Sequence, residues 1–164
     1  MKPLRIGLLG IGTVGGGTFD VLARNAEEIS RRAGRPITIT HVADKNTALA
    51  NQVVAGRATV TDDAFSVVKN PDIDVVVELI GGYTIAKQLM LEAINNGKHV
   101  VTANKALLAV HGNEIFAAAR AKGVIVAFEA AVAGGIPIIK ALREGLVANR
   151  IEWIAGIING TTNF

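Results

Sequence analysis

Short apolar runs alternate along this chain with longer segments in which apolar residues recur every three or four positions. Residues 6–9 form the first apolar run, and the segment behind it carries apolar residues at helical spacing: Val14, Val21, Leu22, Ala26 and Ile29. A short apolar run bounded by turn residues is typical of a buried strand, and the longer spacing is typical of an amphipathic helix. The pattern therefore predicts strands and helices in alternation.

The same alternation continues to about residue 128. We expect strands at 37–42, 73–80, 99–102 and 124–128, and helices at about 46–56, 84–96 and 112–122. The first helix should end at Gly34, and Asp62 with Asp63 should cap another helix that stops before Asn70. Right-handed crossovers between parallel strands then give an α/β fold, a doubly wound parallel sheet of the Rossmann type.

The last part of the sequence has a different pattern. Residues 138–147 are typical of a helix, residues 151–158 are typical of a strand, and a polar turn follows at 159–164. No further element follows that turn to close the structure. We therefore expect the sequence to be part of a longer protein.

Composition narrows the class of partner. Half of the 164 residues are hydrophobic and only 4% are aromatic, a balance that suits parallel strands covered by helices on both faces. The net charge of +3 comes without a long basic run, so we expect anionic small molecules as ligands and no nucleic acid. There is no cysteine, which excludes disulfides and thiolate metal sites.

Two features of the sequence bear on where in the cell the protein is found. The first expected strand begins directly after the first residues, which leaves no room for a signal peptide. No uncharged apolar stretch reaches the roughly 20 residues that cross a bilayer. We expect a cytoplasmic protein with no membrane segment.

A glycine fingerprint follows the first expected strand. Gly10 allows a sharp turn out of the strand, Gly12 allows the backbone to approach phosphate oxygens, and Gly15 allows the next helix to pack closely on the sheet. A dinucleotide pyrophosphate would then lie at a helix N-terminus, where unpaired N–H donors favour an anion. The strand before the glycines and the helix after them favour this interpretation over a purely structural turn.

Two further segments are candidate cofactor contacts. Asp44 stands at the end of the second strand, where an acidic residue commonly holds the adenosine ribose, and Lys45 follows it. A carboxylate repels the 2′-phosphate of NADP and an ammonium attracts it, so this pair leaves the cofactor preference open. Ile80 and Gly81, at the end of the third expected strand, could lie against the cofactor. Simple turns are the alternative at both places.

Lys105 is the candidate catalytic residue. It lies just past the strand at 99–102, at the edge where ligands bind in open parallel sheets. Hydride addition to a carbonyl produces an alkoxide, and a lysine there can stabilise that charge or take part in proton transfer. Lys98, by contrast, follows a helix-ending glycine, and we expect it to be a solvated surface group.

Metal chemistry has one candidate. His41, His99 and His111 are scattered without metal-ligand spacing, so a zinc site is not expected. Glu129 instead leads into a loop of small residues at 130–137, whose carbonyls could turn inward. A carboxylate beside such carbonyls is a possible oxygen cage for a hard cation.

Five motifs together resemble homoserine dehydrogenases, and they lie at residues 10–15, 78–82, 97–105, 129–137 and 156–163. The first motif occurs in many dehydrogenases, but the last three in this order are far more specific. The resemblance implies NAD(P)-dependent interconversion of L-homoserine and L-aspartate 4-semialdehyde, in the biosynthesis of threonine, methionine and isoleucine. It also implies a set of cofactor contacts at Gly12, Thr13, Val14, Ile80, Gly81 and Lys105, with Lys45 at a 2′-phosphate.

The resemblance further implies a sodium-type ion and a second domain. The ion would be held by Glu129 and by the backbone carbonyls of Val132, Gly134 and Ile136. Residues 1–150 would be the NAD(P)-binding domain, and residues 151–164 would begin a substrate and dimerisation domain in which Gly160 and Thr161 lie nearest the substrate. The remaining substrate carboxylates and a general-acid lysine would lie beyond this sequence, so residues 1–164 alone should bind cofactor without catalysing the reaction.

The sequence leaves the cofactor preference and the exact activity open. Many family sequences have an arginine near the end of the second strand where this one has Asp44 and Lys45, which leaves NAD and NADP both possible. The full-length protein is expected to be a homo-oligomer. The alternatives are a related dehydrogenase for another semialdehyde or a sugar, and a non-catalytic dinucleotide sensor, which would need neither Lys105 nor the turn at 159–163.

Overall fold

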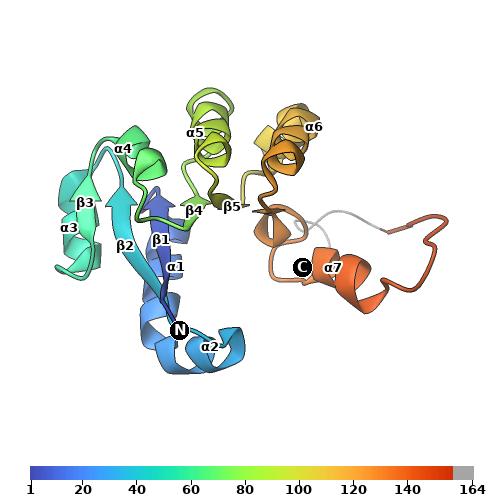
Figure 1. The fold of residues 1–164 in the computed structure, drawn as a ribbon, viewed down its shortest axis with the longest axis horizontal. Coiled ribbons are helices and arrows are strands. Elements are labelled where there is room, and N and C mark those ends of the chain that lie inside the picture. Colours follow the sequence, from blue (N-terminus) through green and yellow to red (C-terminus); the bar gives the residue numbers. More distant parts are fainter. Residues whose placement is uncertain (157–164) are drawn as a thin grey trace.

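A six-stranded parallel sheet forms the centre of the computed structural model, which describes residues 1–156 (Figure 1). The strand order is β3-β2-β1-β4-β5-β6, and every neighbouring pair is parallel. The predicted α/β class and doubly wound sheet are therefore confirmed. The strands are β1 Leu4–Leu9, β2 Ile37–Ala43, β3 Thr59–Thr61, β4 Val75–Glu78, β5 His99–Thr102 and β6 Val126–Ala127.

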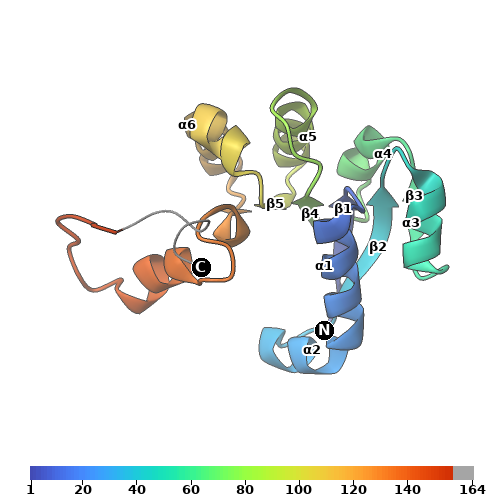
Figure 2. The same cartoon turned by 180° about the vertical axis from the view of Figure 1, so that it is seen from behind.

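Helices cover the sheet from both sides. Figures 1 and 2 show α4, α5 and α6 on one side of the sheet and α1 with α2 on the other. Right-handed crossover connections between parallel strands are expected to give this arrangement. The helices are α1 Thr13–Arg24, α2 Ala26–Ala33, α3 Thr47–Val54, α4 Ala64–Lys69, α5 Thr84–Asn95, α6 Lys105–Lys122 and α7 Ile138–Lys140.

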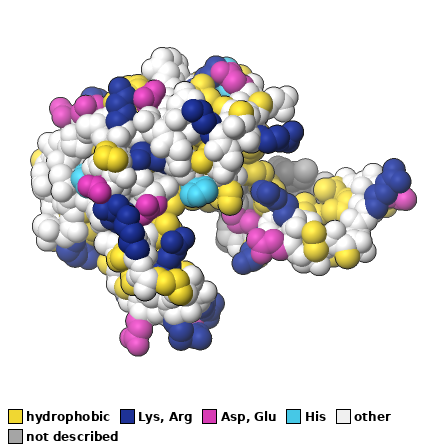
Figure 3. Space-filling model, viewed as in Figure 1, with side chains coloured by type: hydrophobic (Ala, Val, Ile, Leu, Met, Phe, Trp, Pro, Cys, Tyr) yellow, Lys and Arg dark blue, Asp and Glu magenta, His cyan; other side chains and the backbone are white. Residues whose placement is uncertain are grey.

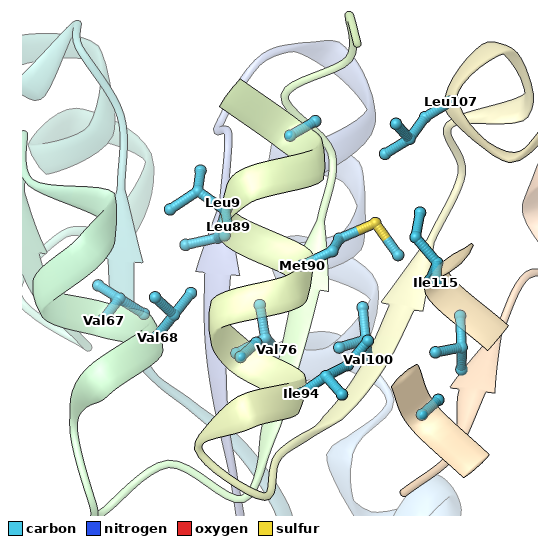
Figure 4. Packing of buried hydrophobic residues seen from close by; sticks show 14 of the residues in the cluster. Leu9, Val67, Val68, Val76, Leu89, Met90, Ile94, Val100, Leu107 and Ile115 are labelled. Atoms are coloured by element: carbon cyan, nitrogen blue, oxygen red, sulfur yellow. The ribbon is translucent and has the colours of Figure 1, made fainter. Parts of the chain in front are cut away.

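Each face of the sheet has its own apolar core. In one core α5 packs on β4 and β5, and Figure 4 shows Met90 and Ile94 of this helix close to Val76 and Val100 of the strands. The other core lies between β1, β2 and the helices α1 and α3. Alternate residues of β4 enter the two cores, as expected for a strand buried on both faces.

Several element boundaries differ from the expected ones. The first helix is two helices, because the chain bends at Asn25 and α2 starts again behind it. Helix α6 begins at Lys105, seven residues before the expected start, because the Asn104 side chain accepts a hydrogen bond from the Leu107 amide at 3.1 Å. Strand β3 was not predicted, since three residues give no clear periodicity.

The part after β6 is less regular than expected. The predicted helix at 138–147 is a short α7 followed by a π-helical turn, Ala141–Gly145. No strand forms over residues 151–156, so the predicted strand at 151–158 is wrong for that part. The turn at 159–164, with Gly160 and Thr161, lies outside the described residues. The domain boundary between residues 150 and 151 stays a prediction.

Lys98 is buried, and the prediction of a solvated side chain was wrong. Only 3% of the residue is exposed, and its Nζ donates hydrogen bonds to the carbonyl oxygens of Asn70 at 2.6 Å and Ile73 at 2.8 Å. Burial lowers the pKa of Lys98, because it disfavours the charged amine. The amine ties the loop before β4 to the start of β5, through acceptors distant in sequence.

The surface carries charges of both signs. Lys, Arg, Asp and Glu side chains are interspersed on the face shown in Figure 3. On α2, Glu28 accepts hydrogen bonds from Arg31 and Arg32, and these bonds lower the pKa of the carboxyl. Within residues 1–156 no helix is long and apolar enough to cross a bilayer.

Candidate functional site

A cleft of about 410 Å³ opens at the carboxyl ends of β1, β2 and β4. This is the edge at which ligands bind in open parallel sheets, next to the point where the strand order reverses. The cleft brings together predicted residues that are far apart in sequence. Its lining includes Gly10, Gly12, Asp44, Lys45, Asp62, Phe65, Leu79 and Ile80.

The three fingerprint glycines have different roles in the turn between β1 and α1. Gly10 has a φ of +93°, and a Cβ there would lie 2.8 Å from the Leu79 carbonyl oxygen. A Cβ at Gly15 would overlap the Gly10 carbonyl oxygen, whereas a Cβ at Gly12 would meet nothing within 4 Å. The fold itself therefore requires Gly10 and Gly15, and Gly12 leaves open space above the turn.

The start of α1 is suited to an anion. No side chain caps this helix, and its first turn, with Thr13 and Val14, contains no acidic residue. The first N–H groups of a helix have no partner within the helix, and the dipole makes this end positive. A phosphate group fits both features, so the residues present are compatible with a dinucleotide.

Asp44 ties the glycine turn to the end of β2. One carboxylate oxygen accepts a hydrogen bond from the Ile11 amide at 2.7 Å, and the other accepts one from the Asn46 amide at 2.8 Å. Lys45 lies beside it and donates from Nζ to the Asp62 carbonyl oxygen at 3.0 Å. Asp44 thus shapes the turn, and Lys45 supplies a positive charge at the rim of the cleft.

The turn after β4 is organised by a buried carboxylate. Gly81 and Gly82 both have positive φ angles, +80° and +75°. Glu78 is fully buried, and its Oε1 accepts hydrogen bonds from the Ile80 amide at 2.9 Å and the Gly81 amide at 3.0 Å. The backbone of the predicted contact residues Ile80 and Gly81 is therefore held by Glu78, which was not predicted to be a site residue.

Lys105 is exposed and opens α6 at the carboxyl end of β5. It does not line the cleft, because β4 lies between β1 and β5 in the sheet. A second hollow, of about 600 Å³, lies on the α1 side of the sheet and extends to the strand end next to Lys105. Its lining includes Thr13, Val14, Val77, Leu79, Val101, Thr102, Ala103 and Ala130.

Glu129 binds the start of α7. Its two carboxylate oxygens accept hydrogen bonds from the Ile139 amide at 2.9 Å and the Lys140 amide at 2.8 Å. The loop between them turns at Ala133 and Gly135, which have φ angles of +47° and +85°. Among residues 1–156 no three His, Cys, Asp or Glu side chains gather to hold a metal ion.

The histidines have local partners. His41 Nε2 lies 3.2 Å from the side-chain nitrogen Nδ2 of Asn70, and His99 Nδ1 accepts a hydrogen bond from the backbone amide of Ile125 at 3.0 Å. Both side chains stabilise loops at the sheet. His111 lies 3.9 Å from Glu114 on the surface of α6.

A protein family model identifies the family to which this chain is related. The family model described as "Homoserine dehydrogenase, NAD binding domain" matches residues 10–129. The chain belongs to the homoserine dehydrogenase family. A second model, described as homoserine dehydrogenase, matches residues 137–164. The family resemblance inferred from the five motifs is confirmed.

Named homoserine dehydrogenases align with the whole chain. The chain is 68% identical to the enzyme of Pseudomonas aeruginosa, 64% to that of Neisseria gonorrhoeae and 44% to that of Bacillus subtilis, each over 164 residues. It spans only 37%, 38% and 38% of these three proteins. The chain thus spans less than half the length of the curated relatives that it matches.

Solved structures of homoserine dehydrogenases have the same fold. A homoserine dehydrogenase from Thiobacillus denitrificans superposes with a TM-score of 0.93 at 66% identity and covers 100% of this chain and 38% of its own. The enzyme from S. aureus gives a TM-score of 0.76 at 35% identity, over 83% of this chain and 34% of its own. The sheet and helices described above are thus those of homoserine dehydrogenases.

Proposed function

We propose that the protein is an NAD(P)-dependent homoserine dehydrogenase, which interconverts L-homoserine and L-aspartate 4-semialdehyde by hydride transfer. The observation that carries this proposal is the placement of Lys105 at the same sheet edge as the glycine turn. The reaction serves the biosynthesis of threonine, methionine and isoleucine, and we place it in the cytoplasm. Reduction of NAD⁺ or NADP⁺ by L-homoserine, assayed with the full-length protein, tests the proposal.

The cofactor would lie across the glycine turn. The pyrophosphate would contact Gly12, Thr13 and Val14 above the turn that Gly10 and Gly15 form. The two hollows on either side of this turn offer room for the two halves of a dinucleotide. Ile80 and Gly81 would contact the cofactor from the end of β4, and Asp44 would lie near the adenosine ribose. When bound, the nicotinamide supplies or accepts the hydride.

Lys105 would act on the substrate oxygen. Reduction of the semialdehyde places negative charge on that oxygen, and an ammonium group nearby stabilises the charge. In the reverse direction the same positive charge would stabilise the oxygen while the hydroxyl proton passes to a base in the remainder of the active site. This role requires the amine to be near the reacting atoms and not deep in the fold, which agrees with the exposure of Lys105.

The proposed active site also includes a cation site and substrate contacts. Glu129 would hold a sodium-type ion together with the carbonyls of Val132, Gly134 and Ile136, since each Glu129 oxygen accepts one hydrogen bond and keeps a lone pair. Gly160 and Thr161 would contact the substrate. Residues 151–164 would begin the substrate domain, through which the full-length protein would form a homo-oligomer.

We expect Lys45→Ala to weaken NADPH binding by about tenfold while NADH binding changes by less than about twofold. The reason is that the ammonium at the cleft rim would face the 2′-phosphate, which NADH lacks. Fluorescence titration of the protein with each reduced cofactor measures the effect, and Lys122→Ala, at the far end of α6, serves as the control. An equal loss for both cofactors would exclude this role.

A further inference from the structure

A buried ring of hydrogen bonds connects the turn after β4 with the start of α6. Glu78 and Thr102 lie opposite each other at the ends of β4 and β5, and neither is exposed. The Thr102 hydroxyl donates to Glu78 Oε2 at 2.7 Å, while Glu78 Oε1 accepts from the Ile80 and Gly81 amides. One carboxylate thus binds groups from two neighbouring strand ends.

Asn104 closes the ring. Its amide donates to Thr102 Oγ1 at 3.0 Å, and its side-chain Nδ2 donates to the Gly82 carbonyl oxygen at 2.8 Å. Its Oδ1 caps α6 through the Leu107 amide. Since Lys105 is the next residue, the same ring that shapes the turn at 80–82 fixes the backbone from which this lysine projects.

The buried carboxylate of Glu78 ends a strand that is otherwise apolar. Residues 75–77 are all valines, and a fourth apolar residue would pack in β4 at no electrostatic cost. A buried carboxylate is tolerated when strong hydrogen bonds replace water, and Glu78 accepts three. Within residues 1–156 no Lys, Arg or His forms an ion pair with Glu78. Its bonds all go to the two segments proposed to meet the cofactor and the substrate.

We propose that Glu78 is a positioning residue, which acts through Thr102 and Asn104 to hold Lys105 at a fixed place relative to the cofactor-binding turn. This inference rests on the proposed function. A displacement of about 1 Å between reacting groups can lower a rate by about a hundredfold, so a rigid link between these segments has a direct consequence for catalysis.

The test cuts one link of the ring in the full-length enzyme. In Glu78→Gln the amide oxygen can still accept from Ile80 and Gly81, but the Thr102 hydroxyl then faces an NH2 group, which can only donate, so its bond to a carboxylate is lost. Thr102→Val removes the hydroxyl with little change of shape, and Thr102→Ser restores it. We expect the first two variants to lower kcat by about 10- to 100-fold, with KM and the cofactor Kd within about threefold, and Thr102→Ser to retain wild-type kcat.

The Lys105→Ala background separates positioning from a general loss of structure. If Glu78 acts through Lys105, Thr102→Val lowers kcat no further once Lys105 is absent, because the two changes remove one function. An equal fold-loss in both backgrounds, or an unchanged kcat in Glu78→Gln and Thr102→Val, would overturn the proposal.

Amide hydrogen exchange provides a readout that needs no substrate. We expect Thr102→Val to speed exchange at both Ile80–Gly81 and Leu107, whereas exchange confined to one segment contradicts the ring. If the wild-type protein does not oxidise homoserine but exchange rises at both places, the proposed function fails while the link between the two segments stands. The two failures are therefore distinguishable.

Discussion

Lys105→Ala in the full-length protein is expected to lower kcat by at least a hundredfold while the cofactor Kd changes by less than about threefold. The amine would stabilise charge on the substrate oxygen, which develops during the reaction and is absent from the cofactor complex. A group that acts only in the transition state affects kcat far more than binding. Steady-state rates with L-homoserine and a fluorescence titration with NADPH measure the two quantities separately.

Lys122→Ala is the matched control for this prediction. Lys122 lies in the last turn of the helix that Lys105 begins. Its substitution by alanine removes the same positive charge from the protein. We expect its kcat to equal that of the wild type. A Lys105→Ala enzyme with unchanged kcat, or one in which cofactor binding falls as much as the rate, would assign Lys105 to another role.

Gly12→Val is expected to abolish dinucleotide binding, with a loss of at least a hundredfold in affinity, in a protein that remains folded. A Cβ at this position meets nothing in the fold within 4 Å, so we expect the cost in stability to be about 1 kcal/mol. The space that it fills is the space proposed for the pyrophosphate. Titration with NADPH and thermal unfolding measure the two effects.

Gly15→Ala gives the contrasting result. Its methyl group would overlap the Gly10 carbonyl oxygen, so we expect a loss of about 3 kcal/mol in the free energy of unfolding. Binding would then be lost because the turn is distorted. If Gly12→Val binds NADPH as tightly as the wild type, the pyrophosphate does not lie at this turn.

Local pattern was sufficient to predict most of the fold. The strand at 99–102 has the predicted bounds, and the helix predicted at 84–96 differs from the observed one by a single residue at its end. These bounds were predictable because Gly97, which has a positive φ, separates the two elements. Strand β3 was missed because it is defined by its pairing with β2, which lies elsewhere in the sequence. The early start of α6 was missed although Asn104 offered a capping signal.

The candidate site was predictable where residues act through position in the sheet. Gly12, Lys45 and Ile80 all line the cleft, since strand ends of a parallel sheet meet at one edge. Lys98 and Glu78 were not predictable in the same way, because their roles depend on partners at other strand ends. A glutamate at the end of a valine run was the available signal for Glu78, since a buried carboxylate must find donors.

Initial rates of the full-length protein with L-homoserine and either NAD⁺ or NADP⁺ test the central claim most directly. We predict that L-homoserine reduces at least one of the two cofactors, that L-aspartate 4-semialdehyde reverses the reaction, and that other alcohols and sugars give far lower kcat/KM. A protein that binds NADPH but oxidises another alcohol, or no alcohol at all, would contradict the claim.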